Sequence, residues 1–109
     1  MIPFAVIGAG WRTEFFLRIA RACPQQFRAV GVLARDLDKA AYVERDFGVA
    51  LFDDLELMLQ EAKPLFVVTS VSWGANPDFI KRLAALKVPV LSETPPATSV
   101  DEMLELWSL

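Results

Sequence analysis

The residues best suited to chemistry lie near the start of the chain, where an apolar run ends in a Gly-x-Gly turn. The turn stands between a predicted strand and a predicted helix, and it comprises Gly8, Ala9, Gly10, Trp11 and Arg12. Gly8 lets the chain turn sharply off the strand, and Gly10 lets a phosphate group approach the backbone. Free amides and the helix dipole favour an anion at a helix N-terminus. The pattern therefore predicts a site for the pyrophosphate of a dinucleotide, and the alternative is an ordinary glycine turn.

Thr13 occupies the third position of this motif, where glycine or alanine is usual. That position serves close packing of helix against strand, so threonine weakens the match but leaves the predicted phosphate site in place. The helix is expected over residues 13–22. Its apolar residues recur at helical spacing, and they are Phe15, Phe16, Ile19, Ala20 and Cys23.

The composition narrows the classes of function. The 109 residues suit one domain, over residues 1–109, and the net charge of −3 without a basic cluster disfavours nucleic acid and anionic membranes as partners. The chain has no histidine and only one cysteine, Cys23, so no metal site is expected and the thiol is expected to be buried and inert. Neither a leader nor a membrane span is recognisable, so the expected location is cytoplasmic.

Five predicted strands alternate with five predicted helices. The strands are expected over residues 1–7, 27–33, 49–52, 65–70 and 88–92, and the helices over residues 13–22, 39–46, 55–62, 77–86 and 100–107. Such alternation predicts an α/β fold with a doubly wound parallel sheet and helices on both faces. We expect the strand order 3-2-1-4-5, with ligand at the carboxyl ends of the first and fourth strands.

Short polar residues mark the expected starts of the later helices. Asp36 or Asp38 is expected to cap the second helix, and Gly48 is expected to end it. Two capping boxes are predicted, one from Asp53 to Glu56 and one from Ser99 to Glu102, and Asn76 is expected to cap the fourth helix. These roles also explain the paired carboxylates of Asp53 and Asp54 better than acid–base catalysis does.

Four short motifs together resemble a known family. Each follows a predicted strand, and they are Gly8-Ala9-Gly10, Ala34-Arg35-Asp36, Thr69-Ser70-Val71-Ser72 and Glu93-Thr94-Pro95. With this spacing the whole chain resembles the N-terminal nucleotide-binding (Rossmann) domain of the glucose-fructose oxidoreductase, inositol dehydrogenase and MocA family. The resemblance implies a nicotinamide dinucleotide as cofactor. It also implies a C-terminal domain, absent from these residues, that binds a small-molecule substrate and often forms the interface of a homo-oligomer.

The end of the second strand departs from the NAD-preferring members of this family. Those members are expected to have an acidic residue there for the adenosine ribose, whereas this chain has Ala34 followed by Arg35. A guanidinium can pair with a 2′-phosphate, so we expect NADP to be favoured over NAD. Asp36 leaves a preference for NAD open, because a shift of one residue in the alignment of this motif brings its carboxylate to the ribose.

The motif after the fifth strand departs as well. The family usually has Glu-Lys-Pro, and Thr94 stands here in place of the lysine, which resembles a proton-relay group in relatives. Threonine does not titrate near neutrality, so the catalytic residue is unknown. By the same resemblance Glu93 lines the nicotinamide end, and Ser70 and Ser72 bond ribose or nicotinamide. The alternative is that Glu93, Ser70 and Ser72 are ordinary turn and loop residues that bind no ligand.

Two main functions stay open on this basis. The first is the NAD(P)-binding domain of an oxidoreductase that transfers a hydride to or from a sugar, polyol or related carbonyl compound. The second is a nucleotide-binding regulatory or sensor module without catalysis, which the missing lysine at Thr94 favours. Binding of S-adenosylmethionine is a third reading, but Ala34 supplies no acidic residue for its ribose.

Overall fold

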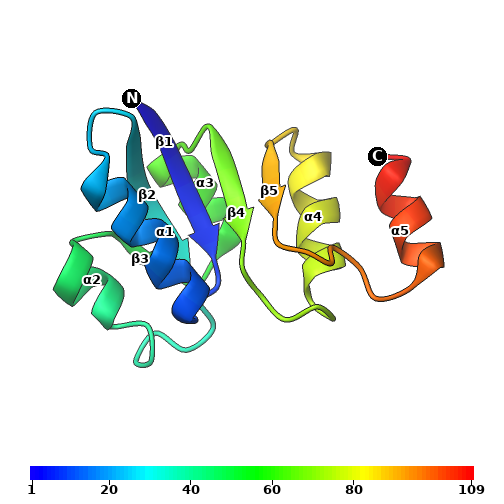
Figure 1. Ribbon diagram of the computed structural model, residues 1–109, viewed down its shortest axis with the longest axis horizontal. Helices are drawn as coiled ribbons and strands as arrows, with labels where there is room; N and C mark the ends of the chain where they lie inside the picture. Colours follow the sequence, from blue (N-terminus) through cyan, green and yellow to red (C-terminus); the bar gives the residue numbers. More distant parts are fainter.

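The computed structural model describes residues 1–109 and shows five strands that alternate with five helices (Figure 1). In chain order these are β1 (Ile2–Ile7), α1 (Trp11–Ala22), β2 (Phe27–Leu33), α2 (Tyr42–Phe47), β3 (Leu51–Phe52), α3 (Leu55–Ala62), β4 (Phe66–Thr69), α4 (Asn76–Ala85), β5 (Val90–Ser92) and α5 (Val100–Trp107). All strand pairs are parallel, and the sheet order is β3-β2-β1-β4-β5. The predicted fold class and the order 3-2-1-4-5 are confirmed. Since β1 and β4 are neighbours, their carboxyl ends flank the crevice where ligands bind in such sheets.

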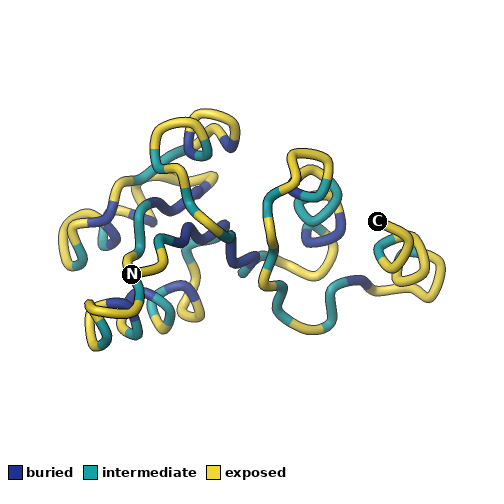
Figure 2. Tube along the Cα trace, turned by 90° about the horizontal axis from the view of Figure 1, so that it is seen from above, coloured by how far each residue is buried: buried dark blue, intermediate teal, exposed yellow.

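The core has two layers because side chains of the central strand alternate between the faces of the sheet. Phe4 and Val6 of β1 pack with α1 and α2, whereas Ala5 and Ile7 pack with α3 and α4. All four side chains are buried. Figure 2 shows the buried residues running through the middle of the molecule and the exposed ones on the outer helices. Helices on both faces explain why β1 and β4 are continuous apolar runs.

Helix α1 begins two residues earlier than predicted, and its buried face is rotated from the predicted one. Its buried residues are Thr13, Leu17 and Ala20, spaced as one helical face, whereas Phe15 is half exposed. The expected stripe is right at Ala20 and at Phe16, which packs against the core, and wrong at Phe15, because Thr13 lies against the sheet and so sets the rotation of the helix. Cys23 is only half-buried.

Two of the predicted helix caps are wrong: one residue caps no helix, and in the other case the neighbouring residue is the cap. Asp36 caps a turn rather than a helix, because its carboxylate accepts from the amides of Asp38 and Lys39 at 3.1 and 3.2 Å, and α2 starts only at Tyr42. Helix α3 is capped by Asp54, whose Oδ1 accepts from the Leu57 amide at 3.0 Å, and not by Asp53. Asp53 and Asp54 are adjacent, so the sequence alone did not show which of them precedes the first residue of α3.

Asn76 lies inside the first turn of α4 and does not cap it. Its buried side chain turns toward the sheet, where Nδ2 donates to Ser92 Oγ at 2.9 Å. The predicted cap of α5 is confirmed, since Ser99 Oγ accepts from the Glu102 amide at 3.1 Å, and Gly48 ends α2 at a φ of 65° as expected.

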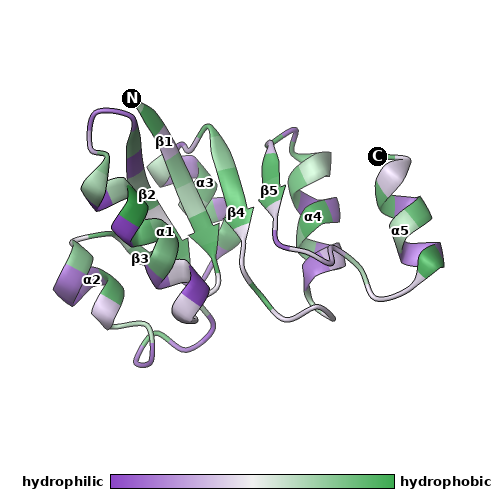
Figure 3. Ribbon diagram, in the orientation of Figure 1, coloured by the Kyte–Doolittle hydropathy of each residue, from purple (hydrophilic) through white to green (hydrophobic).

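Helix α5 stands apart from the sheet and packs beside α4 (Figure 1). Lys81 of α4 pairs with Glu105 of α5 at 2.9 Å, and this contact raises the pKa of Lys81. No residue of α5 is buried, and Trp107 is 89% exposed. Figure 3 shows that hydrophobic and hydrophilic residues alternate around this helix. None of the helices has the length and apolar character that crossing a bilayer requires.

Candidate functional site

The two glycines of the turn after β1 have different roles. Gly8 has a φ of +113°, and a Cβ there would lie 2.0 Å from the carbonyl oxygen of Ser70, so only glycine fits where β1 and β4 end side by side. Gly10 has an ordinary φ of −79°, and a Cβ there would meet no atom within 4 Å. Gly8 is therefore required by the fold, whereas Gly10 faces open space.

Four consecutive amides at this turn donate no hydrogen bond within the chain, and they belong to Ala9, Gly10, Trp11 and Arg12. The first amide of α1 that finds a partner is that of Thr13, which donates to the Gly10 carbonyl at 3.1 Å. Unpaired amides at a helix N-terminus are the donors that hold a phosphate in dinucleotide-binding turns. The turn thus fits the pyrophosphate that the sequence predicts.

Tyr42 of α2 contacts the turn, and no pattern in the sequence predicted this contact. Its hydroxyl lies 3.2 Å from the carbonyl oxygen of Ala9 and 3.3 Å from that of Gly10, so it donates to this pair of acceptors. Burial and the nearby carboxylate of Glu14 raise the pKa of Tyr42. The hydroxyl therefore keeps its proton, and the carbonyls of the turn are held while its amides stay free.

Thr13 suits the third motif position better than the sequence suggested. Its side chain is fully buried, and its hydroxyl donates to the carbonyl oxygen of Gly8 at 2.8 Å. The threonine therefore packs between helix and strand and also satisfies a carbonyl that no other group bonds.

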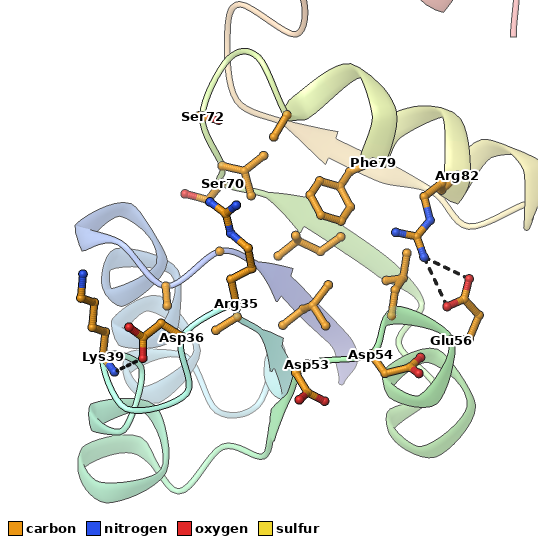
Figure 4. A pocket seen from close by; sticks show the side chains of 18 residues that line it. Arg35, Asp36, Lys39, Asp53, Asp54, Glu56, Ser70, Ser72, Phe79 and Arg82 are labelled. Atoms are coloured by element: carbon orange, nitrogen blue, oxygen red, sulfur yellow. Dashed lines mark hydrogen bonds and ion pairs between the residues drawn. The ribbon is translucent and has the colours of Figure 1, made fainter.

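A cleft of about 830 Å³ opens beside the turn, at the carboxyl ends of β1, β2 and β4. Five of the predicted site residues line it, namely Gly8, Ala9, Arg35, Ser70 and Ser72. Figure 4 shows the Arg35 side chain reaching across the cleft toward Ser70, and Arg35 forms no ion pair. Eight of the 18 residues that line the cleft are hydrophobic, and its volume is in the range of small-molecule sites.

Several other residues line the cleft that the sequence did not single out as site residues, among them Lys39 and Phe79. Lys39 adds a second cation to the lining, apart from Arg35, and Phe79 of α4 forms an apolar wall (Figure 4). Phe79 is half-buried. The lysine carried no signal, because its place in the cleft depends on the turn that Asp36 forms with the Lys39 amide at 3.2 Å.

Of the remaining predicted residues, Trp11, Arg12, Glu93 and Thr94 line a second cavity of about 490 Å³, whereas Gly10 lines neither cavity. Arg12 Nε donates to Glu93 Oε1 at 2.7 Å, and Ser70 Oγ donates to Glu93 Oε2 at 3.4 Å. Because Ser70 lines the first cleft, this hydrogen bond links one residue of each cavity. The structure therefore divides the predicted site residues other than Gly10 into two groups, which this bond connects. Trp73, which follows Ser72 in the same loop, is exposed and lines neither cavity.

Buried polar atoms lie at the carboxyl ends of β4 and β5 and at the start of α4. Asn76 donates to Ser92 Oγ, which in turn donates to the Glu93 carbonyl at 2.8 Å. Thr69 Oγ1 and Asn76 Oδ1 are buried without a hydrogen-bond partner. No group of three or more His, Cys, Asp or Glu side chains is arranged to hold a metal ion.

Comparisons with known proteins agree with this geometry. Residues 2–109 match the model of the GFO_IDH_MocA family, described as "Oxidoreductase family, NAD-binding Rossmann fold". No curated protein matches the chain. Among solved structures, the WlbA dehydrogenase from Chromobacterium violaceum, in complex with NADH and UDP-GlcNAcA, is 20% identical with a TM-score of 0.90 over 98% of this chain and 31% of its own. The myo-inositol 2-dehydrogenase from Lactobacillus plantarum is 18% identical with a TM-score of 0.86 over 98% and 32%.

At these identities the likeness shows the fold, and the sheet order and helices described above are those of a Rossmann-like domain. The chain spans about a third of the length of these relatives, 31% and 32% respectively.

Proposed function

Because the chain belongs to the GFO_IDH_MocA oxidoreductase family through its NAD-binding Rossmann fold, we propose that residues 1–109 hold the cofactor of an enzyme acting on a sugar, polyol or related carbonyl compound. The observation that carries this proposal is the row of unpaired amides from Ala9 to Arg12, next to the open space at Gly10. When bound, the nicotinamide dinucleotide supplies the hydride chemistry, and the protein supplies position and electrostatics.

The chain's own residues have distinct roles in this proposal. The amides of Ala9, Gly10, Trp11 and Arg12 hold the pyrophosphate, and the Tyr42 hydroxyl keeps the turn in the shape that leaves them free. In the cleft, the adenosine half lies between the loop at Arg35 and the apolar side of α4. Ser70, Ser72 and Glu93 lie toward the nicotinamide half and orient it.

We also propose that NADP is preferred over NAD. Two cations, Arg35 and Lys39, line the cleft after β2, and Arg35 has no carboxylate partner. The one acidic residue in this stretch that competes for the ribose is Asp36, and its carboxylate is engaged with the amides of Asp38 and Lys39. At the end of β2, a 2′-phosphate would therefore meet positive charge rather than a free carboxylate.

Calorimetric titration with NADPH and NADH at two salt concentrations tests this proposal. We expect tighter binding of NADPH, and Arg35→Gln should weaken NADPH roughly tenfold or more, the size of a charge-assisted hydrogen bond. The matched control is Arg28→Gln, since Arg28 is exposed at the opposite end of β2. Tighter binding of NADH than NADPH would overturn the preference, and no binding of either to the folded chain would overturn the whole proposal.

The whole enzyme requires more than these residues in our proposal. Thr94 has no group that titrates near neutrality, so a domain outside residues 1–109 supplies the acid–base group and most of the substrate site. The relatives' greater length and the exposed apolar residues Val100, Leu104 and Trp107 support this. We also propose that the whole protein is cytoplasmic and forms a homo-oligomer. A whole protein that binds nucleotide but oxidises no such compound would favour the regulatory alternative.

A further inference from the structure

The second cavity, here called the Arg12 pocket, has a composition that suits a ligand of its own. It lies between the first turn of α1 and the end of β5, with a volume of about 490 Å³. Trp11, Phe16 and Leu91 form its apolar walls, and Arg12, Glu93 and Thr94 supply its polar groups. Apolar walls with a few convergent polar groups are typical of small-molecule sites.

Arg12 is held in a fixed orientation but has unused donors. Its Nε donates to Glu93 Oε1 at 2.7 Å, and Glu93 is held in turn by Ser70. The two terminal nitrogens of the guanidinium donate no hydrogen bond within the chain. Since the Arg12 side chain is 45% exposed, these N–H groups are accessible from the pocket. A guanidinium oriented in this way matches a planar, two-oxygen acceptor.

Aromatic rings support the same cation. The guanidinium carbon of Arg12 lies 5.2 Å from the centre of the Trp11 ring and 5.6 Å from that of Phe15. Both rings favour the cation electrostatically. Trp11 is 74% exposed, so one part of its ring remains free to pack against the apolar face of a ligand.

We propose that the Arg12 pocket binds the carboxylate of a sugar acid or a similar hydroxy acid, through the terminal nitrogens of Arg12. A neutral sugar needs only hydroxyl partners such as Thr94, whereas the unused terminal N–H donors of an oriented guanidinium are matched by a carboxylate. Glu93 repels a second carboxylate, so the ligand approaches the edge of Arg12 that faces away from Glu93.

The position of the pocket makes its ligand the substrate of the proposed enzyme. The Ser70–Glu93 contact joins the Arg12 pocket to the nucleotide cleft, so a bound acid lies beside the nicotinamide half. This assignment of a substrate class rests on the proposed function, whereas binding of the acid by Arg12 does not require it.

The test is a titration of the isotopically labelled chain with D-glucuronate and with D-glucose, followed by nuclear magnetic resonance. The two probes share a ring and differ in the carboxylate. We expect glucuronate to shift the Nε–H signal of Arg12 and the indole signal of Trp11, and to bind roughly tenfold or more tightly than glucose, as a charge-assisted pair implies. Arg12→Gln should abolish this difference. Arg18→Gln, which alters an exposed arginine of the same helix, should keep it.

Glu93→Gln should change the affinity for glucuronate in the opposite direction. It removes the repulsion between Glu93 and the ligand carboxylate and frees Arg12 from its ion pair, so glucuronate should bind more tightly. Equal binding of glucuronate and glucose to the native chain would overturn the inference, even if a variant fails to fold. A separate titration with NADPH keeps the two proposals apart. NADPH binding without a preference for glucuronate refutes only this inference, and glucuronate binding without NADPH refutes only the nucleotide site.

Discussion

The hydroxyl of Thr13 donates to the carbonyl oxygen of Gly8 at 2.8 Å and thereby ties the first helix to the end of the central strand. Thr13→Val keeps the volume but leaves this carbonyl without a partner. We expect a loss of about 1–3 kcal/mol in the free energy of unfolding, measured in urea. Thr98→Val changes an exposed threonine and serves as the control. Equal stability of Thr13→Val and the native chain would show that the bond does not hold the motif.

Gly8→Ala tests the close approach of β1 and β4. The added Cβ would lie 2.0 Å from the Ser70 carbonyl oxygen at a φ of +113°, and both the clash and the φ are unfavourable. We expect a loss of roughly 3 kcal/mol or more, or failure to fold. The control is Gly74→Ala, where the Cβ meets no atom within 4 Å. If both variants melt at the same temperature, the geometry assigned to Gly8 is wrong.

The sequence could predict much of the fold because its signals are local. Apolar runs and glycines predicted the strands and the turn at Gly8, since each depends on neighbouring residues, and the strand order followed from the rules for parallel α/β sheets. It could not choose between Asp53 and Asp54 as a cap, or find the buried face of α1. Those outcomes depend on how the helices rotate against the sheet.

The site was predictable only in part for the same reason. Arg35, Ser70 and Ser72 follow strands whose ends meet, so topology alone brings them to one cleft. The Arg12–Glu93 pair joins residues 81 positions apart, and only the fold shows that Arg12 lines a different cavity. Tyr42 likewise reaches Ala9 across 33 positions.

Tyr42→Phe should loosen the glycine turn, because it removes the donor to the carbonyls of Ala9 and Gly10. We expect a stability loss of about 1 kcal/mol and weaker dinucleotide binding. The pKa of Tyr42 is raised from 10.0, so the stability that this shift contributes is full below pH 10 and is lost as the pH rises further. Urea unfolding at pH 8 and pH 10.5 should therefore show a smaller pH dependence in the variant. An identical pH dependence would contradict this role.

Thr69→Val should leave stability unchanged or increase it. Thr69 Oγ1 is buried without a hydrogen-bond partner at the end of β4, and valine has nearly the same shape without the polar atom. We expect a gain of about 0–2 kcal/mol, since an unsatisfied buried hydroxyl is destabilising. A clear loss in thermal unfolding would mean that the hydroxyl has a partner, such as a buried water shared with Asn76 Oδ1.

The central claim is that the turn at Gly10 holds the pyrophosphate of a nicotinamide dinucleotide, and Gly10→Ala tests it most directly. A Cβ at this position meets no protein atom within 4 Å, and the φ of −79° accepts alanine. Because Gly10 is the N-cap of α1, where alanine is less favourable than glycine, the free energy of unfolding should fall by about 1 kcal/mol or less and the variant should stay folded. The same Cβ enters the space that the phosphates require. Calorimetry should therefore show native binding of NADPH and roughly tenfold or weaker binding by the folded variant. Equal affinity of the two proteins for the nucleotide would contradict the claim.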